Sequence, residues 1–199
     1  MYYSQAGQDR WIDENTRGKT DGYFVDIGAF DGIEYSNTYF LEQHRNWCGI
    51  CIEADITNFD KLKNNRRCTC ENIAVYSCTS MVNFVSSGMA SRIDHDGKIL
   101  VCTDRLEMIL DKNNAPKNID YLSIDIEGCE FEALKSFPFL RYSFNYITIE
   151  HNEYTVGFSY KNMLRNLLQN NGYVLARGDV SHNGLSFEDW YINEKCKIQ

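Results

Sequence analysis

The sequence has little proline, no excess of positive charge and no long apolar run. Its two prolines, Pro116 and Pro138, leave no proline-rich linker that would separate two units. A chain of 199 residues is long enough for one α/β domain with a full core and short for two. We therefore expect a single domain over residues 1–199, in which residues 1–22 form an N-terminal cap segment.

The lack of basic residues argues against one class of partner. The chain has 28 acidic and 20 basic residues, which gives a formal net charge of −8. Sequence-independent nucleic-acid binding needs a basic surface that neutralises phosphates, so we expect no nucleic-acid partner. No apolar stretch approaches the length of a membrane-spanning helix, and no signal peptide is visible. We therefore expect no membrane association and a cytoplasmic location.

The eight cysteines do not form a convincing metal motif. A C-x2-C pair at 48–51 is followed by a C-x-C pair at 68–70, which could suggest zinc. However, Cys51 lies in an apolar, strand-like run, and zinc knuckles need turns that aim both sulfurs at one point. Without a secretory signal, reduced and mostly buried thiols are favoured over disulfides.

One stretch organises the rest of the chain. The apolar run Tyr-Phe-Val-Asp-Ile at 23–27 is short and bounded by glycines, which is typical of a buried strand. A turn through Gly28 and Gly32 follows, where glycine permits positive φ and a close approach of a ligand. A helix is predicted over 38–44. A strand, a glycine turn and a helix form the first unit of a nucleotide-type α/β fold, with its site at the carboxyl end of the strand.

The turn lacks the G-x-G-x-x-G pattern of dinucleotide-binding proteins. Instead, Asp26 precedes its first glycine and Asp31 its last. Two carboxylates would repel a pyrophosphate, but they suit S-adenosylmethionine, which has an ammonium, a sulfonium and no phosphate. A nicotinamide-dependent oxidoreductase also explains Gly28 and Glu53, although it leaves the two aspartates unexplained. A catalytically silent cofactor-binding module is the third possibility.

Further cofactor contacts are predicted at the ends of the next strands. A second strand at 48–53 ends in Glu53, where nucleotide folds bind ribose hydroxyls. A third strand is predicted over 69–75, with Asn72 and Ala74 near its end, where an adenine ring could lie. A helix at 57–64 is expected between them, with Thr57 as its N-cap.

The N-terminal cap segment and the C-terminal end complete the predicted fold. A short helix over 8–17 would let Gln8 reach over the cofactor turn. A helix at 159–170 precedes strands at 173–176 and 185–192. A helix–strand–strand ending is typical of an antiparallel strand near the edge of an otherwise parallel sheet.

Two neighbouring strands end in clusters of polar residues. Ionisable groups are costly near a core unless they serve a ligand, a metal or a partner, so these clusters indicate a site. The clusters follow the strands at 121–124 and 146–149 and consist of Asp125, Glu127 and Glu130, and of Glu150, His151 and Asn152.

Several of these motifs, in this order, resemble the FkbM family of S-adenosylmethionine-dependent methyltransferases. They are the D-I-G-A-F-D-G turn at 26–32, Ser-Asn-Thr at 36–38, G-I-C-I-E at 49–53, Y-L-S-I-D-I-E-G-C-E at 121–130 and Ile-Glu at 149–150. Ser-Gln-x-x-Gln-Asp at 4–9 also resembles the opening of the family. The chain departs from the family pattern at Phe30 and Cys129, and neither departure removes a chemical group.

The resemblance implies a fold and an activity. The fold is the class I methyltransferase fold, a Rossmann-like, doubly wound α/β fold. Its seven-stranded sheet is mostly parallel, with one antiparallel strand near the edge. Members resemble one another in methylating hydroxyl oxygens, often of sugars, so we expect a carbohydrate or glycan acceptor. The predicted cofactor contacts are Gln8, Asp26, Gly28, Asp31, Ser36, Asn37, Glu53, Asn72, Ala74 and Asp125.

Methylation of a sugar hydroxyl needs a base or a Lewis acid, because such a hydroxyl is hardly ionised at pH 7. Asp125, Glu150 and Asn152 are hard oxygen donors that suit Mg²⁺ or Mn²⁺. His151 is the alternative base, since imidazole titrates near neutrality. The predicted catalytic residues are Asp125, Glu150 and His151. Loops at 86–96 and 154–160 are expected to hold the acceptor, with Phe158 and Tyr160 as stacking surfaces.

Overall fold

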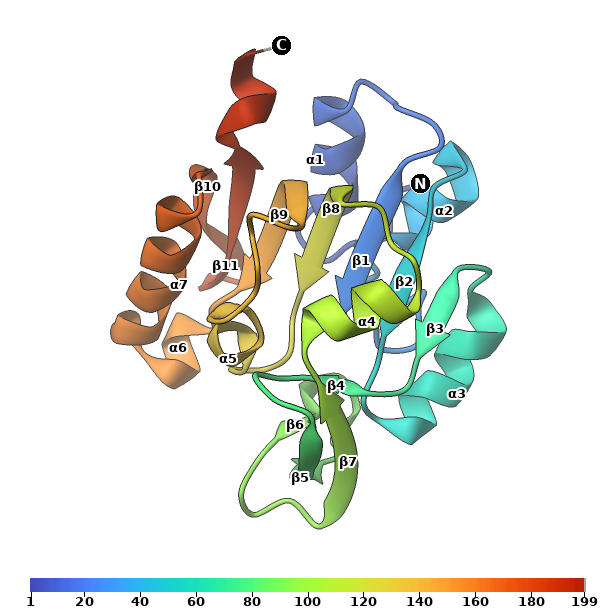
Figure 1. The fold of residues 1–199 in the computed structure, drawn as a ribbon, viewed down its shortest axis with the longest axis vertical. Helices are drawn as coiled ribbons and strands as arrows, with labels where there is room; N and C mark the ends of the chain where they lie inside the picture. The colour runs from blue at the N-terminus through green and yellow to red at the C-terminus, as the bar shows by residue number, and fades with distance from the viewer. Residues whose placement is uncertain (199) are drawn as a thin grey trace.

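The computed structural model describes residues 1–198 and contains two sheets (Figure 1). The larger sheet has seven strands in the order β10-β11-β9-β8-β1-β2-β3. Only β11 runs antiparallel to its neighbours, one position from the edge, as predicted. The strands are β1 (Tyr23–Ile27), β2 (Cys48–Ile52), β3 (Thr69–Glu71), β8 (Asn118–Ile124), β9 (Ser143–Glu150), β10 (Tyr173–His182) and β11 (Leu185–Asn193).

Helices cover both faces of this sheet, because its central strands are apolar on both sides. In β1, Val25 faces one apolar core and Phe24 faces the other, and both are fully buried. The first core includes side chains of α4 (Leu106–Lys112), α5 (Glu130–Leu134) and α7 (Phe158–Asn170). The second includes side chains of α1 (Gln8–Asn15), α2 (Tyr39–Arg45) and α3 (Ile56–Asn65). The observed α/β layering is therefore the doubly wound arrangement that the sequence predicts.

The smaller, four-stranded sheet was not predicted. Its strands lie in the order β4-β7-β5-β6, and Figure 1 shows them beyond the carboxyl ends of the central parallel strands. The short helix η1 lies in the connection between β5 and β6. The bounds are β4 (Ala74–Val75), β5 (Ser80–Val85), η1 (Gly88–Ala90), β6 (Arg92–Ile93) and β7 (Ile99–Asp104).

The single third strand predicted over 69–75 is wrong. The chain pairs with β2 only as far as Glu71, and β4 then pairs with β7 in the smaller sheet. Between them, the side chain of Asn72 donates to the carbonyl oxygens of Glu53 (2.9 Å) and Ala54 (3.1 Å). These bonds hold the segment at the end of β2 while its backbone leaves the larger sheet.

The predicted N-cap of α3 is also wrong. The helix begins at Ile56, and its N-cap is Asp55, whose Oδ1 accepts from the backbone N–H groups of Thr57 (2.8 Å) and Asn58 (3.2 Å). Aspartate and threonine are both favoured N-cap residues, so residue type alone does not choose between Asp55 and Thr57. The remaining helices are α6 (Glu153–Val156) and η2 (Glu194–Ile198). No helix within residues 1–198 is long and apolar enough to cross a membrane.

Candidate active site

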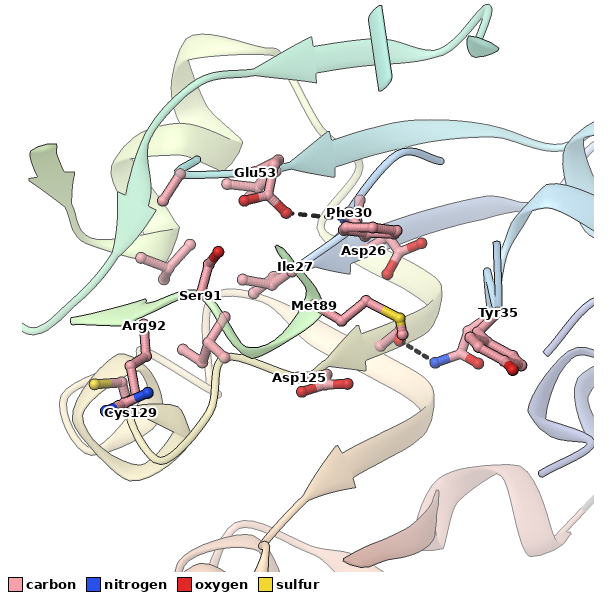
Figure 2. A pocket seen from close by; sticks show the side chains of 18 of the residues that line it. Asp26, Ile27, Phe30, Tyr35, Glu53, Met89, Ser91, Arg92, Asp125 and Cys129 are labelled. Carbon is pink, nitrogen blue, oxygen red and sulfur yellow. Dashed lines mark hydrogen bonds between the residues drawn. The ribbon is translucent and has the colours of Figure 1, made fainter. Parts of the chain in front are cut away.

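A cavity lies at the carboxyl ends of β1, β2 and β8, where the sequence predicts a site. About 1070 Å³ of space lies between its walls, part of it open to solvent. Figure 2 shows Asp26, Glu53 and Asp125 projecting from three separate strand ends. On the side of the smaller sheet, Met89 and Arg92 contribute to the wall.

The turn after β1 is fixed by close backbone contacts. The N–H groups of Gly28 and Ala29 donate to the carbonyl oxygen of Ile52 (2.9 and 3.1 Å). Gly28 has φ of +84°, and a Cβ atom at this position would lie 1.8 Å from the carbonyl oxygen of Asp125. Only glycine fits this conformation and this contact, so the turn holds the ends of β1, β2 and β8 together.

Asp26 lines the cavity and is positioned by a buried polar network. Its Oδ2 accepts from the hydroxyl of Thr38 (2.6 Å), which in turn accepts from Nη2 of Arg66 (3.0 Å). Arg66 also pairs with Glu42 (2.9 Å), and both side chains are almost fully buried. Burial raises the pKa of Asp26, and the positive charge of Arg66 offsets part of this effect. The sequence analysis did not identify Arg66, because nothing in its local pattern separates it from a surface arginine.

Glu53 lies where a ribose-binding carboxylate is expected. It is 7% exposed and lines the cavity. Its Oε2 accepts from the N–H of Phe30 (2.9 Å), as Figure 2 shows, and its Oε1 accepts from that of Asp55 (2.8 Å). Burial raises the pKa of Glu53 to about 7, although both backbone donors favour its ionised form. Ala74, from β4, also lines the cavity as predicted.

Two of the predicted cofactor contacts lie outside the cavity wall. Asp31 uses Oδ1 to accept from the N–H groups of Ile33 (2.9 Å) and Glu34 (2.8 Å), so it stabilises the turn itself. Asn72 lines a separate pocket, and its side-chain amide donates to the carbonyl oxygens at the end of β2. Both residues therefore support the site from outside.

Ser36 and Asn37 do line the cavity, and they differ in what they offer a ligand. Ser36 Oγ accepts from the N–H groups of Thr38 (3.3 Å) and Tyr39 (3.1 Å) near the start of α2. Asn37 Nδ2 donates to the hydroxyl of Ser123 (2.9 Å). Its Oδ1 is buried and has no hydrogen-bond partner in the described part of the chain. An unpartnered acceptor in a cavity wall suits a ligand that donates a hydrogen bond.

Gln8 lines the cavity, but other residues use both polar atoms of its side chain. Its Oε1 accepts from the N–H of Ala6 (2.8 Å), and its Nε2 donates to Oε2 of Glu188 (2.9 Å). Glu188, from β11, also lines the cavity and is 3% exposed. Burial raises its pKa to about 8, while the hydrogen bonds from Trp190 and Gln8 act in the opposite direction. Glu188 was missed by sequence analysis, since it lies 180 residues from Gln8.

The polar clusters after β8 and β9 meet at the edge of the cavity. Asp125, Glu127 and Glu150 each offer a carboxylate oxygen, and these three atoms all lie within 4.8 Å of one another. Asp125 also lines the cavity. Burial and mutual repulsion raise the pKa of Glu127 to about 7 and that of Glu150 well above its usual range. Burial likewise raises the pKa of Asp125.

Asn152 lies against this carboxylate cluster. Its Nδ2 donates to Oε2 of Glu127 (3.0 Å) and Oε2 of Glu150 (2.6 Å), and its Oδ1 is buried without a hydrogen-bond partner in the described residues. Glu127, which was not among the predicted metal ligands, is the third carboxylate of the cluster. Both Glu127 (φ +56°) and Asn152 (φ +41°) have left-handed backbone conformations, which are costly for residues other than glycine and are often found at functional sites.

His151 is not part of the cavity wall in this structure. The residue is 1% exposed, and its Nδ1 accepts from the N–H of Glu153 (3.2 Å). Its Nε2 lies 3.7 Å from Oδ1 of Asp189, which is also paired with Arg165 (2.8 Å). Burial lowers the pKa of His151. The ring is therefore buried beside the ion pair of Asp189 with Arg165, and its Nε2 has no hydrogen-bond partner in the described residues.

The family model described as "Methyltransferase FkbM domain" matches residues 26–175, about three quarters of the chain. The chain belongs to the FkbM methyltransferase family. The prediction from its motifs is thereby confirmed, and the assignment supports S-adenosylmethionine as its cofactor. No curated protein sequence matches the chain. Gln8 and Glu188 lie outside the matched residues.

Solved structures share the class I methyltransferase fold. Methyltransferase FkbM from Methylobacillus flagellatus KT has a TM-score of 0.57 and 18% identity, with coverage of 86% of this chain and 43% of that one. The METTL16 methyltransferase domain has a TM-score of 0.58 and 13% identity, with coverage of 94% of this chain and 66% of that one. A TehB-like S-adenosylmethionine-dependent methyltransferase from Corynebacterium glutamicum ATCC 13032 Kitasato has a TM-score of 0.54 and 11% identity. The match covers 97% of this chain and 89% of that one. The chain thus spans less than half the length of the FkbM structure.

Proposed function

We propose that this FkbM-family chain is an S-adenosylmethionine-dependent O-methyltransferase that methylates a hydroxyl of a sugar or glycan, with Mg²⁺ or Mn²⁺ assisting deprotonation. One observation carries the proposal. The carboxylate cluster of Asp125, Glu127 and Glu150 lies beside the cofactor-type cavity, and Asp125 belongs to both. This arrangement supports the proposal, because a cation held by the cluster would lie next to the space for a methyl donor.

The hydrogen-bond acceptors and the apolar wall of the cavity fit S-adenosylmethionine. Glu53 would accept from the ribose hydroxyls, and the unpartnered Oδ1 of Asn37 would accept from the ammonium group. The apolar side chains of Ile73, Val75 and Phe84 give a wall that suits an adenine ring. When bound, this cofactor supplies a methyl group already activated on a sulfonium, so the protein mainly has to position the acceptor.

The carboxylate cluster fits a divalent cation. Three carboxylates this close, one buried and two half-buried, repel one another, and this repulsion adds to burial in raising the pKa of Glu127 and Glu150. Mg²⁺ and Mn²⁺ prefer such oxygen ligands, and a bound cation would offset the repulsion. Asp125, Glu127 and Glu150 would hold the ion, and Asn152 would orient the two glutamates. The ion would lower the pKa of an acceptor hydroxyl.

Exposed aromatic side chains near the cluster support a sugar acceptor. Tyr154 is 53% exposed, and Glu150 and Glu127 lie close enough to help raise its pKa. Phe158 is 60% exposed. Tyr160 offers less surface, since its ring is half-buried against the first apolar core, and its hydroxyl donates to Glu130 (2.7 Å) and accepts from the N–H of Phe131. The most exposed aromatic rings are therefore those of Tyr154, close to the acid cluster, and of Phe158.

The alternatives that the sequence left open have less support. The match to a methyltransferase family does not support a nicotinamide-dependent oxidoreductase. The silent cofactor-binding module would not need the strained backbone and the three closely spaced carboxylates that the structure holds beside the cavity.

Calorimetric titration of S-adenosylhomocysteine with and without Mn²⁺, on the wild type and on Asp125→Asn, tests the proposal. We expect micromolar binding of the product, a separate heat of metal binding, and loss of the metal heat in the variant. A second assay follows transfer of a labelled methyl group to a panel of neutral, acidic and amino sugars. Absence of product binding would overturn the methyltransferase assignment for this chain. Binding with no metal response would overturn only the metal role.

A further inference from the structure

Two side chains from opposite ends of the chain, both outside the family-matched residues, meet in the cavity wall. Gln8 of α1 donates through Nε2 to Oε2 of Glu188 in β11 (2.9 Å). Both side chains line the cavity and both are nearly fully buried, with exposures of 2% and 3%. The N-terminal cap segment and the last strand therefore complete the cofactor site together.

The packing behind Glu188 locks its carboxylate in place. Nε1 of Trp190 donates to the same Oε2 atom (2.5 Å), and the Trp190 ring is fully buried. Trp11 of α1 lies against that ring at a centroid distance of 4.9 Å. Trp190 belongs to a small apolar cluster that also contains Val180 and Phe187. Two neutral donors and an apolar backing thus fix the carboxylate at the cavity.

The charge of Glu188 has no counterpart in the described protein. Its hydrogen-bond partners are an amide and an indole, and no Lys or Arg within residues 1–196 forms an ion pair with it. The only cationic side chain in the cavity wall is Arg92, which is paired with Asp94 (2.9 Å). A buried carboxylate without a cationic partner is costly unless a ligand supplies the charge.

We propose that Glu188 recognises the positive charge of S-adenosylmethionine and so favours the cofactor over its neutral product, and that Gln8 is its positioning residue. This inference rests on the proposed function. The cofactor and S-adenosylhomocysteine differ by one methyl group and by the charge on sulfur. Burial favours the protonated form of the Glu188 carboxyl, whereas the positive sulfonium of a bound cofactor would favour the ionised form and be attracted by it. The neutral product offers no such attraction. Preference for the charged form would help the product to leave.

The test compares the dissociation constants of S-adenosylmethionine and S-adenosylhomocysteine by calorimetry. In the wild type we expect the charged cofactor to bind more tightly. In Glu188→Gln, which keeps the shape and an acceptor for Trp190, we expect that preference to fall about tenfold, through weaker binding of the cofactor alone. In Gln8→Ala we expect a smaller fall of about threefold. Glu14→Gln, an exposed change on the same helix, controls for net charge and should leave the preference unchanged.

The outcomes separate the two proposals. If the wild type binds neither ligand, the proposed function fails and this inference fails with it. If the wild type binds both and Glu188→Gln keeps the preference, only this inference is overturned. If Gln8 has a purely structural role, Gln8→Ala weakens the binding of both ligands equally. If it is a positioning residue, Gln8→Ala changes the ratio of the two dissociation constants, and it causes no further change in that ratio when combined with Glu188→Gln. If Glu188→Gln does not fold, the ratio in Gln8→Ala decides.

Discussion

Gly28 and Asp125 are in backbone contact, because a Cβ atom at Gly28 would lie 1.8 Å from the carbonyl oxygen of Asp125. This contact joins the two motifs on which the site depends. The glycine turn after β1 holds Asp26 at the cavity, and the end of β8 holds Asp125 between the cavity and the carboxylate cluster. A residue with a side chain at position 28 would push these two parts of the site apart.

We therefore expect Gly28→Ala to destabilise the protein and to abolish measurable binding of S-adenosylhomocysteine. The left-handed conformation alone costs alanine about 1–2 kcal/mol, and the backbone clash adds to this cost. Urea denaturation and calorimetry would measure the two effects. Gly184→Ala is the matched control, since Gly184 has φ of +81° with no atom within 4 Å of the added Cβ. Equal losses of stability in the two variants would contradict the clash.

The buried pair of Arg66 and Glu42 should be essential for stability. Arg66 donates to Glu42 (2.9 Å), and its exposed side-chain fraction is 0%. Arg66→Met would leave the carboxylates of Glu42 and Asp26 buried without a cation, so we expect a loss of about 3–5 kcal/mol in the free energy of unfolding. Arg10→Met removes an exposed ion pair with Glu14 and should cause no measurable loss. A small effect of Arg66→Met would mean that Glu42 is satisfied by its backbone donors alone.

The sequence prediction and the structure disagree about which residue is the N-cap of α3. Asp55→Ala removes the acceptor for two backbone N–H groups, and we expect a loss of about 1 kcal/mol in the free energy of unfolding. Thr57→Ala should cost less, because Thr57 only donates its backbone N–H to the cap. Chemical denaturation of both variants measures the difference. A larger loss for Thr57→Ala would restore the cap that the sequence indicated.

Local patterns were sufficient for the central strands of the larger sheet and for the residues at their ends. The short apolar runs at 23–27 and 121–124 correspond to β1 and to part of β8. A strand that is buried on both faces is apolar along its whole length, so its own sequence is enough to identify it. The sequence also placed Asp26, Glu53 and Asp125 at a cavity, because the carboxyl ends of parallel strands meet at one edge of a sheet. The break between β3 and β4 was missed, since it depends on the side-chain bonds of Asn72.

Contacts between distant segments could not be predicted. Glu188 comes to the cavity because β11 pairs with β9, and neither the spacing nor the residue type of Glu188 indicates this. His151 follows a strand that ends at the site, yet its ring is buried beside Asp189. Sequence order shows which residues lie at a strand end, whereas packing against α7 and β11 decides where each side chain points.

The pH dependence of stability should show the buried carboxyl of Glu53. Burial raises its pKa in the folded state to about 7, above the unfolded value of about 4.3. The folded state thus binds more protons between these values, so this group's contribution to stability falls as pH rises from about 4.3 to 7 and is constant above that. The contribution lost is about 4 kcal/mol. We expect Glu53→Gln to become more stable relative to wild type across this range, as denaturation from pH 4.5 to 8 would show. A constant difference between them would contradict the raised pKa.

Metal binding should reverse the effect of removing one carboxylate from the cluster. Without metal, Glu150→Gln relieves repulsion with Asp125 and Glu127, so we expect it to be at least as stable as the wild type. With Mn²⁺ at about 100 times its dissociation constant, the wild type should gain about 2.7 kcal/mol, and the variant should gain little of this. Thermal unfolding with and without Mn²⁺ measures both effects. Glu132→Gln, on α5 and paired with Lys135, is the control that should respond to Mn²⁺ like the wild type. An equal gain in Glu150→Gln would remove Glu150 from the proposed metal ligands, and no gain in the wild type would remove the metal.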